Sequence, residues 1–326
     1  MRKLRHRAAA GALLLAATLG FGSSAFAADY PTRTITILTP FAAGSVTDAA
    51  ARVVAQALSE TLRQSVVVEN RPGAGGMTAS LEVARAVPDG YTFGLVVSTH
   101  SSLAAISKKL PYDTERDFAP VVFVGSIPLV LLVNQKSPYK SLPELLAAAK
   151  AKPGSLNYAF PGVGLSHHLA GELLKQRAGV DIQAVSYRGT APALNDVIGG
   201  AVEMTFGTLP AVMGAIGGGL VRALAITAPR RAESLPDVPT VAELGFDGFD
   251  MSEWFGIVAP ANTPQAIVAR LNAETNTVLV DPELQLWLKQ NNVIRGATTP
   301  DGFRQFISDE IKKLSQIAAK AGVSLD

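Results

Sequence analysis

Residues 34–62 read TITILTPFAAGSVTDAAARVVAQALSETL, and this stretch indicates the fold. Its first six residues are dominated by Thr and Ile and predict a strand. A loop of small residues follows, and from Asp48 to Leu62 the apolar side chains form one helical stripe. The same succession of strand, loop and helix recurs along the chain, so we expect an α/β protein with parallel or mixed sheets.

The other predicted strands are short apolar runs, several of them almost continuous, as is typical of strands covered on both faces. They lie at residues 66–69, 92–97, 121–124, 130–133, 157–160, 182–185, 202–206, 223–227 and 255–258. The end of the chain is predicted to be helical at residues 264–279, 282–290 and 300–321.

A chain of 326 residues suggests about two domains. No Gly/Ser-rich linker separates them, which indicates that strands cross between two lobes. The candidate crossing segments are residues 125–133 and 251–258. One lobe then comprises residues 28–127 together with 250–326, and the other comprises residues 128–249. Two lobes joined by such strands enclose a cleft, which suits a protein that closes on a ligand by hinge motion.

The N-terminus predicts a secretion signal. Four basic residues lie within positions 2–7, an apolar run follows at 8–21, and Ala25-Phe26-Ala27 fits a cleavage site. Cleavage after Ala27 leaves 326 − 27 = 299 residues and removes four of the 29 basic residues, so the mature charge is 25 − 27 = −2. The apolar run is too short for a membrane span. We therefore expect a soluble periplasmic protein without a nucleic-acid partner.

The composition argues against several kinds of chemistry. The chain has no cysteine, which excludes disulfides, thiolate metal sites and a thiol nucleophile. It has no Gly-Lys pair and therefore no P-loop. His167 and His168 are adjacent and cannot jointly chelate one ion on a helix, so we expect one of them to pack or cap and the other to be solvated. We expect neither a metal nor a cofactor.

A first candidate binding site is the loop between the first strand and the first helix. Small residues let the backbone approach a ligand closely, and free N–H groups at a helix start attract anions. Ser45 and Asp48 also have the spacing of a capping box, so Asp48 either caps the helix or contacts the ligand. The candidate residues are Phe41, Ala42, Ala43, Gly44, Ser45, Thr47 and Asp48.

A second loop repeats this arrangement in the other predicted lobe. It resembles the opening of a dinucleotide fingerprint, but His167 takes the place of the third glycine. It also resembles half of a nucleophile elbow, but His168 replaces the closing glycine, so we expect no catalytic residue. Two such loops facing each other would clamp one small anion. The candidate residues here are Phe160, Gly162, Gly164, Leu165, Ser166 and His168.

Two lesser candidates follow other predicted strands. Ser98 and Thr99 come after the strand at 92–97, and Arg188, Gly189 and Thr190 come after the strand at 182–185. Open α/β sheets bind ligands at the carboxyl ends of their strands, where hydroxyls and a guanidinium hold carboxylates. Helix capping, or a surface salt bridge for Arg188, explains these residues equally well.

The segments, in this order, resemble the Bug family, the extracytoplasmic solute receptors of tripartite tricarboxylate transporters. The resemblance spans the mature chain and rests on Tyr30-Pro31, Pro40-Phe41, Gly44, Asp48, residues 66–76, Pro88-Asp89-Gly90-Tyr91-Thr92, Leu110-Pro111-Tyr112-Asp113, Gly162-x-Gly164, His168-Leu169-Ala170, Tyr187-Arg188-Gly189, Ala191-Pro192-Ala193-Leu194, residues 235–240 and Trp254-x-Gly256. It implies a two-lobed, type II-like periplasmic binding protein of α/β class, with crossing strands as the hinge. It also implies that the two loops hold a carboxylate through backbone N–H groups and water, and that a membrane permease receives the ligand.

The chain departs from the family pattern inside the two loops. Ala42, Ala43 and Ser45 stand where proline and a second glycine are common, and Phe160-Pro161 replaces two small hydroxyl residues. Leu165 replaces a frequent serine, and Gly207 falls where an aspartate is common. Fewer hydroxyls and one acid less suggest a bulkier, more apolar pocket. We therefore expect a less polar mono- or dicarboxylate, with aromatic acids among the candidates.

Two alternatives stay open at this point. A receptor that presents its ligand to a membrane sensor kinase, and not to a permease, would have the same site. A periplasmic hydrolase would use Ser166 or Ser98 beside a histidine, although no complete nucleophile motif is present. For the receptor we expect a monomer.

Overall fold

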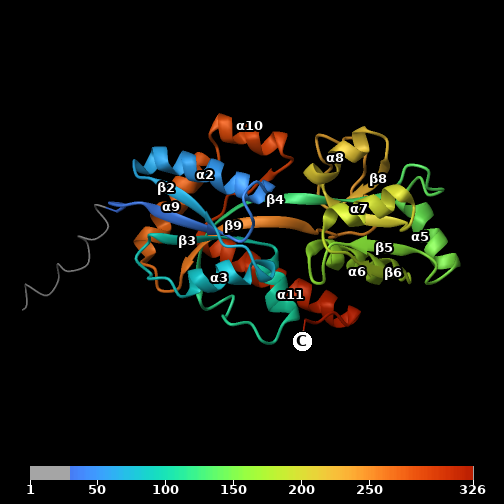
Figure 1. Ribbon diagram of the computed structural model, residues 1–326, viewed down its shortest axis with the longest axis horizontal. Helices are drawn as coiled ribbons and strands as arrows, with labels where there is room; N and C mark the ends of the chain where they lie inside the picture. Colours follow the sequence, from blue (N-terminus) through green and yellow to red (C-terminus); the bar gives the residue numbers. More distant parts are fainter. Residues whose placement is uncertain (1–29, 326) are drawn as a thin grey trace, which may run out of the picture.

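The computed structural model describes residues 30–325. The predicted secretion signal lies outside these residues. Figure 1 shows an elongated molecule whose two halves are joined by the long strands β4 and β9. None of the helices within residues 30–325 has the length and apolarity that a membrane crossing requires.

The elements before and within the first crossing alternate as predicted. In chain order they are β1 (Ile35–Thr39), α2 (Val46–Leu62), β2 (Val66–Asn70), a 3-10 turn (Ala74–Gly76), α3 (Met77–Ala84), β3 (Thr92–Val97), α4 (Thr99–Ile106) and β4 (Phe118–Asn134).

The remaining elements build the second half and then return to the first. They are α5 (Leu142–Ala151), β5 (Asn157–Phe160), α6 (Ser166–Ala178), β6 (Gln183–Ser186), α7 (Thr190–Gly199), β7 (Met204–Thr208), α8 (Leu209–Gly217), β8 (Val221–Ile226), β9 (Ser252–Pro260), α9 (Gln265–Val278), α10 (Pro282–Gln290), β10 (Ile294–Arg295) and α11 (Pro300–Ala321).

Strand β4 is one continuous strand, whereas the sequence analysis predicts two separate strands at 121–124 and 130–133. The intervening residues, which include Gly125 and Pro128, stay extended because they pair with residues 252–255 of β9. Beyond Pro128 the same strand pairs with β7 and β8. The prediction of two strands is therefore wrong, and the prediction that 125–133 and 251–258 lie in crossing strands is confirmed.

The strand directions place two sets of loops opposite each other. In the first half β1 and β3 are parallel, β9 runs antiparallel to β3, and β4 runs antiparallel to β9, so β1 and β3 point the same way as β4. In the second half β7 runs antiparallel to β4, and β5 and β6 are parallel to β7. The carboxyl ends of β1 and β3 therefore face those of β5, β6 and β7 across the crossing strands.

Helices cover both faces of each half-sheet. One core of the first half packs beneath α2, α9 and α10, and a second core packs against α3 and α11. In the second half α5 and α6 cover one face, while α7 and α8 cover the other. Helix α11 contacts both halves, since Phe303 packs with Trp254 in one core and Leu314 belongs to the core that contains Leu129. The predicted lobe boundaries themselves stay a prediction.

Candidate functional site

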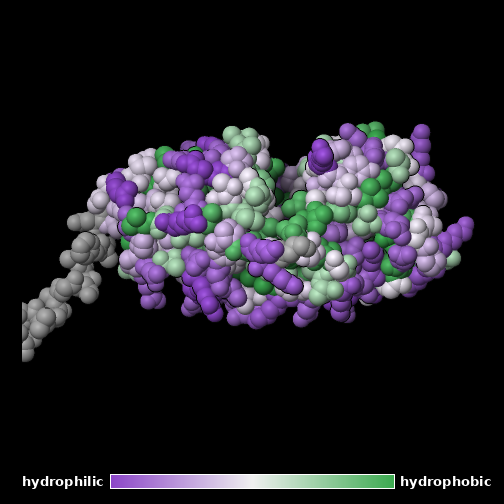
Figure 2. Space-filling model, turned by 60° about the horizontal axis from the view of Figure 1, so that its bottom comes forward, coloured by the Kyte–Doolittle hydropathy of each residue, from purple (hydrophilic) through white to green (hydrophobic). Residues whose placement is uncertain are grey.

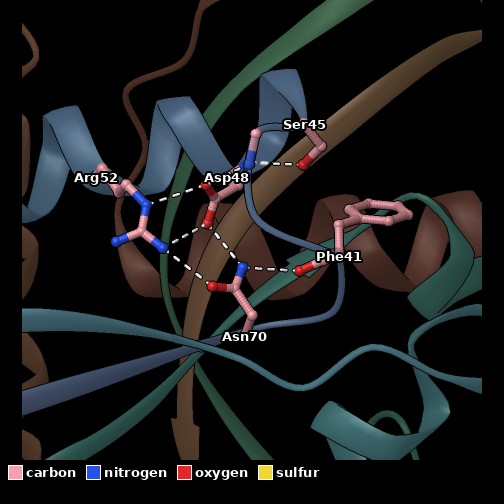
Figure 3. A network of polar contacts seen from close by, with 6 residues as sticks. Phe41, Ser45, Asp48, Arg52 and Asn70 are labelled. Carbon is pink, nitrogen blue, oxygen red and sulfur yellow. Dashed lines mark hydrogen bonds and ion pairs between the residues drawn. The ribbon is translucent and has the colours of Figure 1, made fainter.

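The loop after β1 is held by a buried carboxylate. Asp48 is 2% exposed, and its Oδ2 accepts a hydrogen bond from the Gly44 N–H at 3.0 Å. Arg52 bonds to both of its oxygens at 3.0 Å, and Asn70 Nδ2 donates to Oδ1 at 2.7 Å. Asn70 Nδ2 also donates to the Phe41 carbonyl at 2.8 Å, so one network ties the loop to α2 and β2 (Figure 3).

The capping box predicted for Ser45 and Asp48 is half formed, because the Asp48 carboxylate accepts the Gly44 N–H while the Ser45 N–H donates to the Ala42 carbonyl. The backbone N–H of Asp48 donates to Ser45 Oγ at 3.0 Å, which completes the N-terminal cap of α2. Burial alone would raise the pKa of Asp48, but the hydrogen bonds from Arg52, Asn70 and Gly44 outweigh it and hold that pKa below its usual value. Asp48 is thus an ionised group that shapes the loop.

The exposed part of this loop is the backbone around Gly44. Ala42, Ala43 and Gly44 are exposed, and Gly44 has a φ of +88°, which favours glycine. The Gly44 N–H is already bonded to Asp48. Among the hydrogen bonds of the described residues none takes the N–H of Val46 or Thr47, so these first-turn groups are the donors that the loop offers to an anion.

The loop after β5 leads into α6, whose first turn has no side-chain cap. The Gly164 N–H donates to His168 Nδ1 at 3.2 Å, and the His168 ring stacks on Phe160 with centroids 4.1 Å apart. Gly164 has a φ of +77°, and Leu165 stands at the N-cap position. This packing fixes the direction in which the free N–H groups of the α6 start point.

The prediction that one histidine of the pair is solvated is wrong, because both are buried. His168 lies against Phe160, and His167 lies with Nδ1 3.6 Å from Glu253 Oε1 on β9. Burial lowers the pKa of both rings, which favours neutral imidazoles. Neither histidine is solvated because the start of α6 packs against the crossing strand β9 and against α4. His167 lies near Glu253 of β9, and Ile106 of α4 lies beside Gly164.

Ser98 and Thr99 are buried at the end of β3, and both hydroxyls are engaged. Ser98 Oγ donates to Glu253 Oε2, and Thr99 Oγ1 donates to the Gly75 carbonyl at 2.6 Å. A hydrolase that used Ser98 would need its hydroxyl on an imidazole, and here it lies on a carboxylate.

Glu253 is the residue of this region that the sequence analysis missed. It accepts the hydroxyl of Ser98, which follows β3, and its other oxygen lies 3.6 Å from His167 of α6. The signal that could have identified it is an acidic side chain inside a predicted crossing segment that is otherwise apolar, directly before the Trp254-x-Gly256 motif.

The other candidates lie at the ends of β6 and β7. Arg188 is exposed, Gly189 has a φ of +120°, and Thr190 begins α7, which has no side-chain cap. Gly207 is buried, and a Cβ there would lie 2.4 Å from Val212 Cγ1, so this position is packed against α8. Thr208 is the N-cap of α8, again without a side-chain hydrogen bond.

Helix starts that lack a side-chain cap therefore meet at one edge of the second half-sheet. Helices α6, α7 and α8 follow the neighbouring parallel strands β5, β6 and β7. Their first N–H groups carry partial positive charge and face the start of α2 across the crossing strands. This arrangement is suited to binding a small anion between the two halves. No group of three or more His, Asp or Glu residues within residues 30–325 is arranged to hold a metal ion.

The two halves also touch beside this site. Lys289 Nζ of α10 lies 2.7 Å from Glu233 Oε2, and Ser234 Oγ donates to Asn292 Oδ1 at 2.5 Å. A cavity of about 650 Å³ opens there, lined by Leu209, Arg230 and Arg295 among others, and by none of the predicted site residues. In Figure 2 the surface is indented between two rounded halves, with hydrophobic residues gathered near the middle.

Comparison with known proteins identifies close relatives over nearly the whole chain. The family model described as the tripartite tricarboxylate transporter family receptor, TctC, matches residues 50–323. Protein BugT of Bordetella pertussis is 38% identical over 313 residues, which cover 95% of each chain.

Solved structures agree with this match. Rpa4515 of R. palustris with adipate has a TM-score of 0.79 and 34% identity, covering 91% of this chain and 99% of that one. MatC of Rhodopseudomonas palustris with bound malate has a TM-score of 0.74 and 33% identity, covering 88% of this chain and 99% of that one. The periplasmic binding protein BugD has a TM-score of 0.75 and 33% identity, covering 90% and 99%.

Proposed function

The chain belongs to the tripartite tricarboxylate transporter receptor family, and on that premise we propose that it captures a small organic carboxylate between its two lobes and delivers it to a membrane permease. The family consists of solute receptors of the Bug type and not of enzymes. We further propose that the chain is exported and acts in the periplasm, as its periplasmic relatives do.

The observation that carries this proposal is the set of helix starts on the two sides of the crossing strands. The first turn of α2 offers the N–H groups of Val46 and Thr47, and α6 offers those of its first turn beside Ser166. A carboxylate has several acceptor sites, so it can take donors from both sides at once. The relatives Rpa4515 with adipate and MatC with bound malate support this proposal.

Closure follows from the way the two halves are connected. A ligand that accepts hydrogen bonds from both halves makes more contacts when they approach than when they are apart, and it therefore shifts the population toward the closed form. Strands β4 and β9 are the connection about which the halves turn. A permease that recognises the closed form would then receive only loaded receptor.

A thermal-shift screen of the mature protein tests this function. Mono- and dicarboxylates, aliphatic and aromatic, are added at the same concentration. An acid present at about 100 times its Kd stabilises the native state by about 2.7 kcal/mol, so we expect an increase of several degrees in the melting temperature. Neutral amides of the same acids serve as the control and are expected to give no shift. Equal shifts with acids and amides, or none with any acid, would contradict the proposal.

A further inference from the structure

Glu253 lies where the two half-sheets face each other. Side chains alternate along a strand, so Glu253 faces the same side of β9 as Phe255 and Ile257, which pack in the core beneath α2. Its neighbour Trp254 faces the opposite side and packs on Phe303 of α11. The Glu253 side chain remains 22% exposed, on the face from which α2 begins.

The two carboxylate oxygens of Glu253 have different surroundings. Oε2 accepts the hydroxyl of Ser98, which fixes the orientation of the group. Oε1 lies 3.6 Å from His167 Nδ1, which is too far for a hydrogen bond. Among the contacts of the described residues no donor reaches Oε1. Oε1 is not among the buried unpaired atoms of the described residues, so it is the oxygen of this oriented acid that solvent or a ligand can reach.

His167 beside it also lacks partners. The ring is buried, and neither of its nitrogens has a hydrogen-bond partner within residues 30–325. Buried polar groups in folded proteins are nearly always hydrogen-bonded, so this cluster has bonding capacity that the protein itself does not use. Three elements contribute to this cluster: Ser98 follows β3, Glu253 lies on β9, and His167 lies in the first turn of α6.

The charge of this cluster is opposite to that of the helix starts around it. The starts of α2 and α6 attract an anion, whereas a carboxylate repels a second anion and can only accept hydrogen bonds. A ligand that completes both features has a carboxylate at one end and a hydrogen-bond donor at the other. A bound analogue that lacks the donor would cover Oε1 without giving it a hydrogen bond, and it would therefore bind more weakly.

We propose that Glu253 selects the ligand, and that the receptor binds carboxylic acids bearing a hydroxyl or ammonium group that donates to Glu253 Oε1. This inference rests on the proposed function and narrows its ligand class. Ser98 and His167 are positioning residues: Ser98 orients the carboxylate, and the buried His167 ring packs beside Oε1.

Isothermal titration of matched acids tests this selection. The probes are propionate, lactate and alanine, then succinate, malate and aspartate, and then 3-phenylpropionate, 3-phenyllactate and phenylalanine. Within at least one trio we expect the hydroxy or amino acid to bind about 10- to 100-fold more tightly than the unsubstituted acid, because a hydrogen bond to a charged group is made or lost. Comparison of the hydroxy and amino members distinguishes the two donors.

Two variants test whether Glu253 causes the preference for the hydroxy or amino acid. Glu253→Met removes the acceptor and is expected to abolish the preference while the unsubstituted acid still binds. Glu253→Gln keeps an acceptor oxygen but removes the charge, so a preference for ammonium is expected to fall and one for hydroxyl to persist in part. Glu60→Gln, at an exposed position of α2, is the matched control and should bind as the wild type does.

The outcomes separate this inference from the function on which it rests. If acids bind the wild type but the unsubstituted members bind as tightly as the others, the selection is overturned and the receptor function stands. If the preference persists unchanged in both Glu253 variants, the assignment to Glu253 is overturned. If no acid binds the wild type, the proposed function fails and the selection fails with it.

Discussion

Replacing Gly44 by Val is expected to lower the affinity for the bound acid by about 100-fold, which corresponds to about 2.8 kcal/mol. Gly44 is exposed at the turn before α2, and no atom lies within 4 Å of a Cβ built there. A valine side chain would therefore fit the free protein, but it would occupy the space through which the ligand approaches the N–H groups of Val46 and Thr47. Titration of the mature variant with the best acid of the screen measures the effect.

Because Gly44 has a φ of +88°, the valine variant also loses folding stability, and this loss must be separated from the loss of affinity. A left-handed conformation costs a residue with a side chain about 1–2 kcal/mol, so the melting temperature of the variant should fall by a few degrees. Gly245→Val is the matched control, because Gly245 is also exposed, has a φ of +97° and has no atom within 4 Å of its Cβ position. The control should lose similar stability and keep its affinity. Unchanged affinity in Gly44→Val would argue against the role of this loop.

Replacing Gly164 by Ala is expected to weaken binding by about 10- to 100-fold and to destabilise the protein by about 2–5 kcal/mol. The added Cβ would lie 2.0 Å from Ile106 Cδ1 of α4, and the φ of +77° adds backbone strain. The loop would have to move away from α4, which displaces the start of α6 and its N–H groups. Affinity and thermal unfolding are measured on the same preparation.

The substitution Ile106→Val separates the two causes of the Gly164→Ala effect, which are the clash with Ile106 and the backbone strain at a positive φ. Valine lacks the Cδ1 atom that meets the new Cβ, whereas the next Ile106 atom lies 3.5 Å away. The double variant Gly164→Ala/Ile106→Val should therefore regain much of the lost affinity while keeping the strain from the positive φ. Ile106→Val alone should cost about 0.5–1.5 kcal/mol of stability and leave binding near the wild-type value. No recovery in the double variant would show that displacement of the loop is not the cause.

Much of the fold follows from local patterns in the sequence. The strand predicted at 157–160 and the helices predicted at 282–290 and 300–321 agree with β5, α10 and α11 to the residue. The family resemblance and the two-lobed α/β binding-protein fold are confirmed by the match to the receptor family and by the solved relatives. The continuity of β4 could not be predicted, because Gly125 and Pro128 interrupt its apolar pattern and only pairing with β9 keeps them extended.

The candidate site is less accessible to sequence reasoning, because it depends on contacts between distant segments. The cap that the Ser45 side chain gives to the Asp48 N–H is local, and the spacing of these two residues predicts it. The bonds from Asn70 to Asp48 and from Ser98 to Glu253 join residues 22 and 155 positions apart. The burial of His167 depends in the same way on β9, which lies far along the chain. The identity of the site residues therefore stays a prediction that the variants above test.

The central claim is that one ligand draws the two halves together, and a distance between the halves tests it most directly. Because the chain has no cysteine, Gln56→Cys on α2 and Asn195→Cys on α7 would carry the only two spin labels, both at exposed positions. Double electron–electron resonance then gives the label-to-label distance with and without a saturating concentration of the best acid. We predict a shorter and narrower distance distribution with the acid. An unchanged distribution, under conditions where titration shows that the acid is bound, would contradict closure of the two halves around the ligand.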